Sequence, residues 1–204
     1  VLMSKVNIET IDDISIYGFI GEAANNIIEK NKLSLNSVIK SGDGLILNNS
    51  KDKIKGLTLL SKNKSSEQLK IKTFQKSSNF NVNYFLDANK GMIRLTMKSK
   101  EKYIPQVLNL EDLNGISYKK GCYTGQEIVA RTHYLGKIKR KLMLFNCNSI
   151  DLNIEDKILN QDKQVIGEIL TNGFEINDSY LYFAVIKLNN SNESLFSGNH
   201  TLHL

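Results

Sequence analysis

KIKRKLMLF, residues 137–145, alternates charged and apolar side chains, and this two-residue period predicts a β-strand with one face on a hydrophobic core. Further short strands are predicted after it, separated by turn residues and with no helical pattern between them: 156–160, 164–171, 179–188 and 200–204. Successive short strands of this kind favour a small antiparallel barrel or sandwich. We therefore predict that residues 136–204 form a C-terminal antiparallel barrel or sandwich.

We place the domain boundary near Leu135–Lys137. Upstream of it, the patterns mix strands with helices. Strands are predicted at residues 1–9, 14–20, 45–49, 54–60 and 82–87, and helices at 21–33 and 65–76. The mixture indicates an α+β layer, so residues 1–135 are predicted as an α+β domain. Residues 89–118 have no regular pattern and contain the only proline, Pro105, which is typical of a segment that lines a site.

The composition favours a globular protein with a basic surface. The net charge of +6 and the pI near 9.1 suit a polyanionic partner, although abundant Lys, Asn and Ile throughout the chain explain the charge equally well by composition. No apolar run approaches the roughly 20 residues of a membrane span, and no leader is recognised, so we expect a cytoplasmic protein and no membrane partner. Cys122 and Cys147 lack metal-ligand spacing, and no stably bound metal is expected.

KKGCYTGQEIVAR, residues 119–131, contains one of the two cysteines. Residues 124–127 match a capping box, which predicts a helix that starts there and ends near Gly136. Cys122 would precede the helix N-terminus, beside Lys119 and Lys120, and both features favour the thiolate. We predict a functional thiolate at Cys122; a buried structural cysteine is the alternative that the residues leave open.

KKGCYTGQE closely resembles the signature of the YgfZ family of folate-binding proteins. YIPQVLNLEDLNGISY (103–118) and IVAR (128–131) resemble the flanks of that signature. The resemblance implies a distant relationship to aminomethyltransferase, the T-protein of the glycine cleavage system. It also implies ferredoxin-like α+β units followed by a C-terminal β-barrel, in agreement with the patterns above, and a family portion that precedes Val1.

The same resemblance implies a function. It implies tetrahydrofolate as cofactor, a role in assembling or repairing iron–sulfur clusters that supports tRNA modification, and iron–sulfur proteins or cluster carriers as partners. Cys122 is the residue we expect to act as the functional, catalytic thiolate. The motif positions expected at the cofactor site are Lys120, Gly121, Tyr123, Gly125, Gln126 and Glu127, with Arg131 just beyond.

Two amides and two arginines outside the signature are further candidates for binding the cofactor. Gln106 and Asn109, beside Pro105, could offer paired donors and acceptors to a pterin ring, or could merely cap a loop. Arg131 and Arg140 could pair with the carboxylates of a folate tail, because the guanidinium group binds carboxylates bidentately. The neighbouring lysines are expected on the solvent face of a strand.

Two other functions remain open on the sequence. One is a folate-dependent aminomethyl or one-carbon transferase, which would make the protein an enzyme with a positioned carboxylate or thiolate beside the folate. The other is a basic RNA-binding module, which the general positive charge permits but does not favour.

Overall fold

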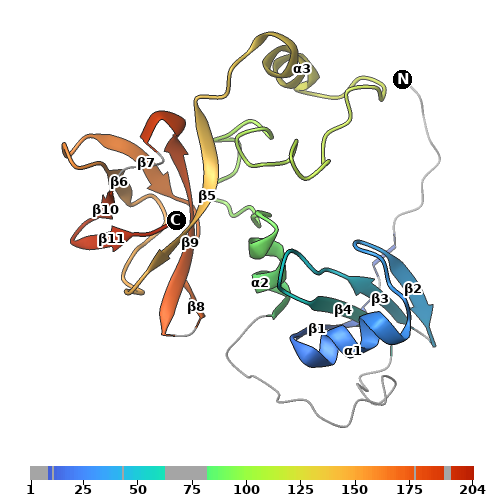
Figure 1. Cartoon of the computed structure of the whole chain (residues 1–204). Helices are drawn as coiled ribbons and strands as arrows, with labels where there is room; N and C mark the ends of the chain where they lie inside the picture. Colours follow the sequence, from blue (N-terminus) through green and yellow to red (C-terminus); the bar gives the residue numbers. More distant parts are fainter. Residues whose placement is uncertain (1–8, 11, 43, 63–81, 177, 191–193) are drawn as a thin grey trace. The chain divides into compact units, whose positions relative to one another are not determined.

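The computed structural model describes residues 9–10, 12–42, 44–62, 82–176, 178–190 and 194–204 (Figure 1). The strand predicted at 1–9 and the helix predicted at 65–76 lie almost entirely or entirely outside these residues. Contacts between residues divide the chain into a unit up to Leu86 and a second unit from Asp87 to Leu204. Each unit is described below by itself.

The first unit contains a four-stranded antiparallel sheet in the order β1-β4-β3-β2. The elements run in the order β1 (Ser15–Ile20), α1 (Glu22–Lys30), β2 (Val38–Ser41), β3 (Gly44–Asn48) and β4 (Gly56–Ser61). Ala24 and Ile27 of α1 pack with Leu57 and Leu59 of β4, so the helix covers one face of the sheet. The predicted strands at 14–20, 45–49 and 54–60, and the helix at 21–33, are confirmed. β2 was not predicted.

Helix α2 (Val82–Asn89) replaces the strand predicted at 82–87, and that prediction is wrong. A short apolar run does not distinguish a strand from a buried helix by its period alone. Leu86 is buried, and Asn83 accepts a 2.9 Å hydrogen bond from the Thr58 hydroxyl. The helix ends in a turn at Gly91, which has a positive φ of 82° that suits glycine.

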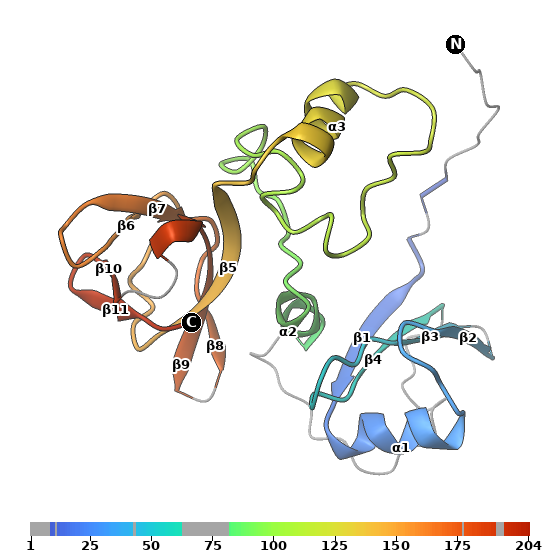
Figure 2. The ribbon, with the colours of Figure 1, turned by 45° about the horizontal axis from the view of Figure 1, so that its top comes forward.

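The second unit contains a curled antiparallel sheet in the order β11-β10-β6-β7-β9-β5, with β8 paired to β9 (Figure 2). Its strands are β5 (Arg140–Cys147), β6 (Lys157–Leu159), β7 (Val165–Ile169), β8 (Phe174–Ile176), β9 (Ser179–Lys187), β10 (Leu195–Ser197) and β11 (His200–Leu202). A bridge between Asn146 in β5 and His203 beyond β11 joins the two edges of the sheet. The predicted α+β class with a barrel-like C-terminal part is confirmed, although β8 and β10 were missed.

Strand β9 is buried on both faces. One face lies in the barrel core, and the other contacts the irregular segment that precedes the barrel in sequence. Tyr182, Ala184 and Ile186 point into the barrel core. Phe183 and Val185, on the opposite face, pack in a second cluster with Val107, Leu108 and other residues of the irregular segment. Residues 90–125 contain no helix or strand, which agrees with the irregular segment predicted at 89–118, and part of this segment lies against the outer face of the barrel.

This packing explains why the contacts group residues from Asp87 onward with the barrel rather than dividing the chain at residue 135. Strand β5 does begin just after the predicted boundary, at Arg140. The division into domains at 1–135 and 136–204 stays a prediction, because contact grouping within one chain does not test where an independently folding domain begins.

Candidate functional site

Helix α3 (Gln126–Leu135) carries most of the signature, and it begins differently from the prediction. Gly125 precedes it with φ 86°, in the left-handed region, and no side chain caps the first turn. The predicted capping box at Thr124 is therefore wrong, because the chain enters the helix through a left-handed glycine one residue later. The end at Gly136 is confirmed.

Gln126 closes the loop in place of the capping box. Its side-chain Oε1 accepts a 3.3 Å hydrogen bond from the backbone N–H of Tyr123. The backbone N–H of Gln126 donates to the Tyr123 carbonyl over 3.1 Å. Lys120 lies over the Tyr123 ring, with Nζ 4.7 Å from the ring centre. These contacts give Lys120, Tyr123 and Gln126 a common structural role in shaping the loop that carries Cys122.

The two free cysteines differ in exposure. Cys122 is exposed on the loop, whereas Cys147 is buried at the end of β5 in the barrel core. The alternative in which Cys122 is a buried structural cysteine is therefore excluded. Gly121 beside it has open space around its Cα, since no described atom lies within 4 Å of the position that a Cβ would take.

Gln106 joins the irregular segment to α3. It is 2% exposed, and its Nε2 donates a 2.7 Å hydrogen bond to the Val129 carbonyl inside the helix. A second, longer contact of 3.4 Å reaches the Tyr118 hydroxyl. Because the amide nitrogen is fixed by a carbonyl acceptor, the orientation of the amide follows, and its Oε1 is buried without a hydrogen-bond partner among the described residues.

Asn109 makes a similar arrangement against the barrel. It occupies the left-handed region with φ 63°, and its Nδ2 donates to the carbonyls of Gly91 and Leu142 over 3.3 and 3.2 Å. Its Oδ1 is also buried without a partner. The amide nitrogens of Gln106 and Asn109, the two residues predicted to bind a pterin, thus make hydrogen bonds within the fold. Only their amide oxygens remain available to accept a hydrogen bond from a ligand.

Sequence reasoning missed a cluster at the last turn of α3. His133 Nδ1 lies 2.5 Å from Glu111 Oε1, and the imidazole stacks on Tyr118 with ring centres 3.9 Å apart. Tyr134 packs edge-on against both rings. Burial raises the pKa of Tyr118, and the Glu111 charge adds to the rise. Residues so distant in sequence carry no local pattern that would have revealed this pairing.

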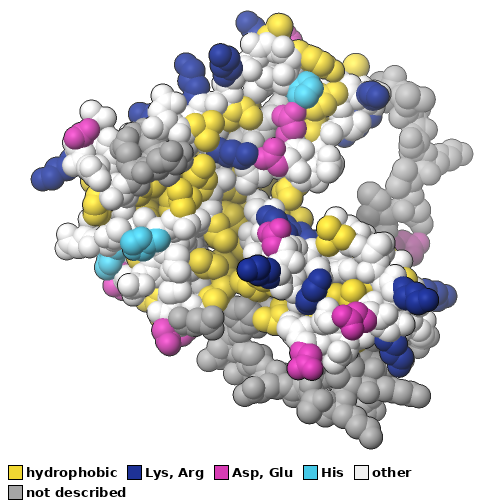
Figure 3. Space-filling view, viewed as in Figure 1, with side chains coloured by type: hydrophobic (Ala, Val, Ile, Leu, Met, Phe, Trp, Pro, Cys, Tyr) yellow, Lys and Arg dark blue, Asp and Glu magenta, His cyan; other side chains and the backbone are white. Residues whose placement is uncertain are grey.

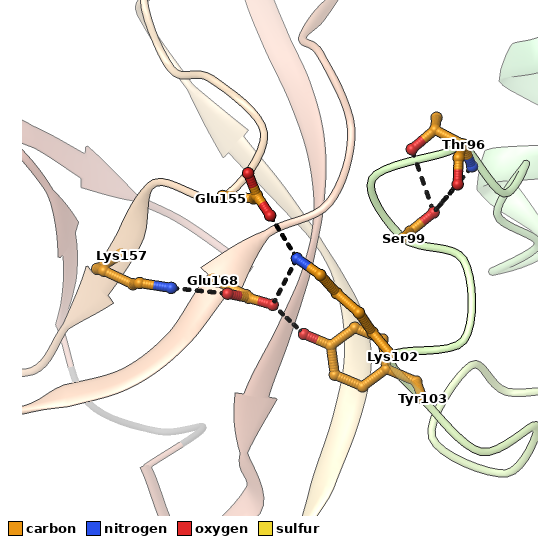
Figure 4. A network of polar contacts seen from close by, with 7 residues as sticks. All are labelled: Thr96, Ser99, Lys102, Tyr103, Glu155, Lys157 and Glu168. Atoms are coloured by element: carbon orange, nitrogen blue, oxygen red, sulfur yellow. Dashed lines mark hydrogen bonds and ion pairs between the residues drawn. The ribbon is translucent and has the colours of Figure 1, made fainter.

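A polar network fastens the irregular segment to the barrel (Figure 4). Glu168 of β7 accepts hydrogen bonds from Tyr103 and from Lys157, and Lys102 binds Glu155 over 2.5 Å. Burial raises the pKa of Glu168, but the hydrogen bonds from Lys157 and Tyr103 outweigh it and leave the pKa below the ordinary value. Burial and the Glu168 carboxylate together raise the pKa of Tyr103.

The remaining predicted residues lie on the surface. Glu127 and Arg131 are exposed on α3, and Arg140 is exposed at the start of β5. Gln106 is joined directly to α3, but Asn109 contacts Gly91 and β5 instead. The structure therefore brings part of the predicted set together around α3, and the binding roles of all these residues stay predictions.

Among the described residues, no group of three or more His, Cys, Asp or Glu side chains could hold a metal ion. Within the same part of the chain, no helix has the length and apolar character that crossing a bilayer requires.

No family model matches the chain, but individual relatives do. The tRNA-modifying protein YgfZ of Colwellia psychrerythraea is 33% identical over 152 residues, which cover 71% of this chain and 46% of that protein. YgfZ of Vibrio atlanticus is 35% identical over 161 residues, covering 77% of this chain and 48% of that protein. YgfZ of Pectobacterium carotovorum is 51% identical over 57 residues, 28% of this chain.

Among solved structures, the glycine cleavage system aminomethyltransferase T from Bartonella henselae shares the fold. The TM-score is 0.56 at 11% identity, over 88% of this chain and 55% of that one. The chain spans about half the length of the curated relatives it matches. Together with the signature at residues 119–127, these matches confirm the predicted recognition: the chain is a YgfZ-family sequence with an aminomethyltransferase-like fold.

Proposed function

We propose that this chain is a cytoplasmic folate-binding accessory protein that assists the assembly or repair of iron–sulfur clusters and thereby supports tRNA modification. The YgfZ relatives carry the name of tRNA-modifying proteins, and the fold is that of an aminomethyltransferase. Tetrahydrofolate is the proposed cofactor, and iron–sulfur proteins or cluster carriers are the proposed partners.

The buried amide oxygens of Gln106 and Asn109 carry the proposal for folate. Native proteins rarely leave a buried acceptor without a donor, so each such atom calls for a missing partner. The Asn109 nitrogen donates to two carbonyls, and the Gln106 nitrogen donates to a carbonyl and to the Tyr118 hydroxyl, so only the acceptor oxygens are left. The amino group and ring N–H groups of a pterin are donors, and they match acceptors of this kind. The residues therefore fit the group.

The tail and the thiolate complete the proposed site. Arg131 and Arg140 are exposed and would pair with the carboxylates of the folate tail. A reduced folate, when bound, supplies a carrier for one-carbon units. Cys122 is exposed on its loop and would contact a cluster or its carrier. Since a cluster generally takes about four protein ligands, one cysteine would make a transient or shared contact.

Calorimetric titration of reduced tetrahydrofolate into this chain tests the folate proposal. We expect a Kd in the micromolar range, about −8 kcal/mol. Gln106→Met removes the unpartnered oxygen at nearly constant volume, and it should weaken binding about tenfold or more. Absence of binding by the chain, and equally by a chain extended at its N-terminus, would contradict the proposal.

Thr171→Val is the matched control. Thr171 is 4% exposed, and its hydroxyl accepts a 2.9 Å hydrogen bond from the Phe183 amide in the barrel. Its loss should cost stability much as Gln106→Met does, about 1–3 kcal/mol, without changing the affinity for folate. If both variants lost folate equally, the effect would be one of stability rather than of the amide.

Cys122→Ser separates the accessory role from a transferase. In the accessory role, the variant should fold and bind folate normally and should lose activity in supporting iron–sulfur enzymes in cells. Turnover of a methylene or aminomethyl donor by the chain, lost in Cys122→Ser, would instead establish the one-carbon transferase.

A further inference from the structure

Helix α3 exposes an apolar face. Ile128, Tyr134 and Leu135 are 61%, 68% and 84% exposed. With 3.6 residues per turn, Ile128, Arg131 and Leu135 follow one another along the same side of the helix, and Tyr134 borders them. Figure 3 shows hydrophobic side chains at the surface over α3, with Lys and Arg side chains beside them. We call these four residues the α3 face.

The α3 face is held on a fixed support. Val129, on the opposite side of the helix, is buried, and its carbonyl accepts the hydrogen bond from Gln106. At the last turn, His133 is paired with Glu111 and stacked on Tyr118. The helix is thus fastened at its middle and at its end, so its exposed side is presented in one orientation with little entropy left to lose on binding.

Basic side chains outnumber acidic ones in α3 and its flanks at residues 119–139, and Glu111 lies against His133 at the last turn. Lys119, Arg131, Lys137 and Lys139 are exposed, and none of their side chains forms an ion pair or hydrogen bond with a described residue. The helix contains a single acidic residue, Glu127. Some lysines elsewhere in the second unit are paired, for example Lys157 with Glu168. A binding partner should therefore carry acidic side chains around an apolar centre.

We infer that the α3 face is a docking surface for a protein partner with an acidic rim and an apolar helix or patch at its centre. Two of its three apolar side chains are aliphatic, and aliphatic side chains pack against other proteins. Single-stranded nucleic acid is bound mainly by aromatic rings on which bases stack, and the α3 face has one. Exposed Cys122 lies four residues before the helix, so such a partner would dock close to the thiol in sequence.

Fluorescence anisotropy with two synthetic amphipathic helical peptides tests the inference. Both peptides have the same leucine face, and their polar faces consist of glutamates in one and lysines in the other. The glutamate peptide should bind the chain, and the lysine peptide should not. Ile128→Ser with Leu135→Ser should weaken binding about tenfold or more. Arg131→Glu with Lys137→Glu should reverse the preference between the peptides.

Ile150→Ser with Val165→Ser is the matched control, because these residues are 59% and 53% exposed away from α3. This variant should bind the glutamate peptide as the parent does. Three outcomes would overturn the inference: no binding of the glutamate peptide, tighter binding of a single-stranded oligoribonucleotide than of that peptide, or self-association of the chain that Ile128→Ser with Leu135→Ser abolishes. Arg131 also belongs to the proposed folate site, but Ile128 and Leu135 do not, so Ile128→Ser with Leu135→Ser tests this inference separately from folate binding.

Discussion

The barrel and the irregular segment before it lie in the same unit but are built by different means. In the barrel, strands of regular alternation bury large side chains such as Phe145 and Tyr182 completely. Residues 90–125 form no helix or strand. Apolar side chains such as Val107 and Leu108 pack on the outer face of the barrel, and polar contacts join Gln106 to Val129, Asn109 to Leu142 and Tyr103 to Glu168. The first region rests on burial of apolar area between regular strands, whereas the second combines apolar contacts with individual donors and acceptors.

This difference between the two regions indicates which of them could bind a ligand. Among the described residues, the buried side-chain oxygens without hydrogen-bond partners are those of Gln106 and Asn109, both in the irregular segment, which also carries the exposed thiol of Cys122. Individual polar contacts can be rearranged around a ligand more readily than a close-packed core. The predictions that follow test this contrast, from the largest expected effect to the smallest.

Phe145→Ala should reduce the free energy of unfolding by about 3–5 kcal/mol, because a fully buried aromatic ring leaves a cavity that the barrel cannot refill. Chemical denaturation monitored by circular dichroism measures the loss. Met97→Ala, in the irregular segment, is the control: its side chain is 84% exposed, and its loss should change the free energy by no more than about 0.5 kcal/mol. Equal losses of unfolding free energy in Phe145→Ala and Met97→Ala would contradict the proposed difference between the barrel and the irregular segment.

The two cysteines report on the same contrast through their reactivity. Cys122 is exposed and should react with a thiol reagent in the native state, whereas buried Cys147 should react only when the barrel opens. We expect their rates to differ by about a hundredfold or more at neutral pH. Mass spectrometry of the labelled peptides identifies the site, and Cys122→Ser provides the control. Rapid labelling of Cys147 would show that the barrel opens readily.

Glu168→Gln should loosen the junction between the two regions by about 1 kcal/mol at neutral pH, since the carboxylate is only 19% exposed and binds Lys157 and Tyr103. Its pKa is lowered in the folded state, so its contribution is present above the ordinary pKa and is lost as pH falls through the folded value. The parent and the variant should therefore converge below about pH 4 in thermal denaturation. A gap that stays constant down to pH 2 would contradict the assignment.

Gly125→Ala should cost about 1 kcal/mol, because φ of 86° strains any residue with a Cβ. Gly121→Ala is the matched control: neither glycine has a described atom within 4 Å of an added Cβ, but Gly121 does not have a positive φ. The control should stay within about 0.5 kcal/mol of the parent in chemical denaturation. A similar cost at both positions would mean that the loop, and not the left-handed residue, sets the penalty.

The barrel was predictable because its longer strands are apolar or alternating runs separated by turn residues. KIKRKLMLF places Leu142 and Leu144 toward the outer cluster and Phe145 toward the core, and a two-residue period records such burial locally. Helix α1 was predicted correctly because its apolar residues recur at the helical period. The run at 82–87 was misassigned because six residues are too few to separate the two periods.

The candidate site was predictable only where residues adjoin in sequence. The exposed Cys122 and the helix that ends at Gly136 follow from local chemistry. The pairing of Glu111 with His133 and the use of the Gln106 nitrogen on Val129 depend on how the chain folds back on itself, which no local pattern records. The capping box failed because its glycine adopts a conformation that other residues resist and so shifts the start of the helix by one position.

The bridge between Asn146 and His203 imposes an order on the folding of the barrel during synthesis. β5 is made first, yet its pairing partners are β9 and the residue that follows β11. Until those residues have left the ribosome, both edges of β5 remain free to pair with other chains. Contacts between such distant residues also form slowly. A nascent chain should thus hold an unclosed barrel, open to chaperones, until His203 has left the ribosome.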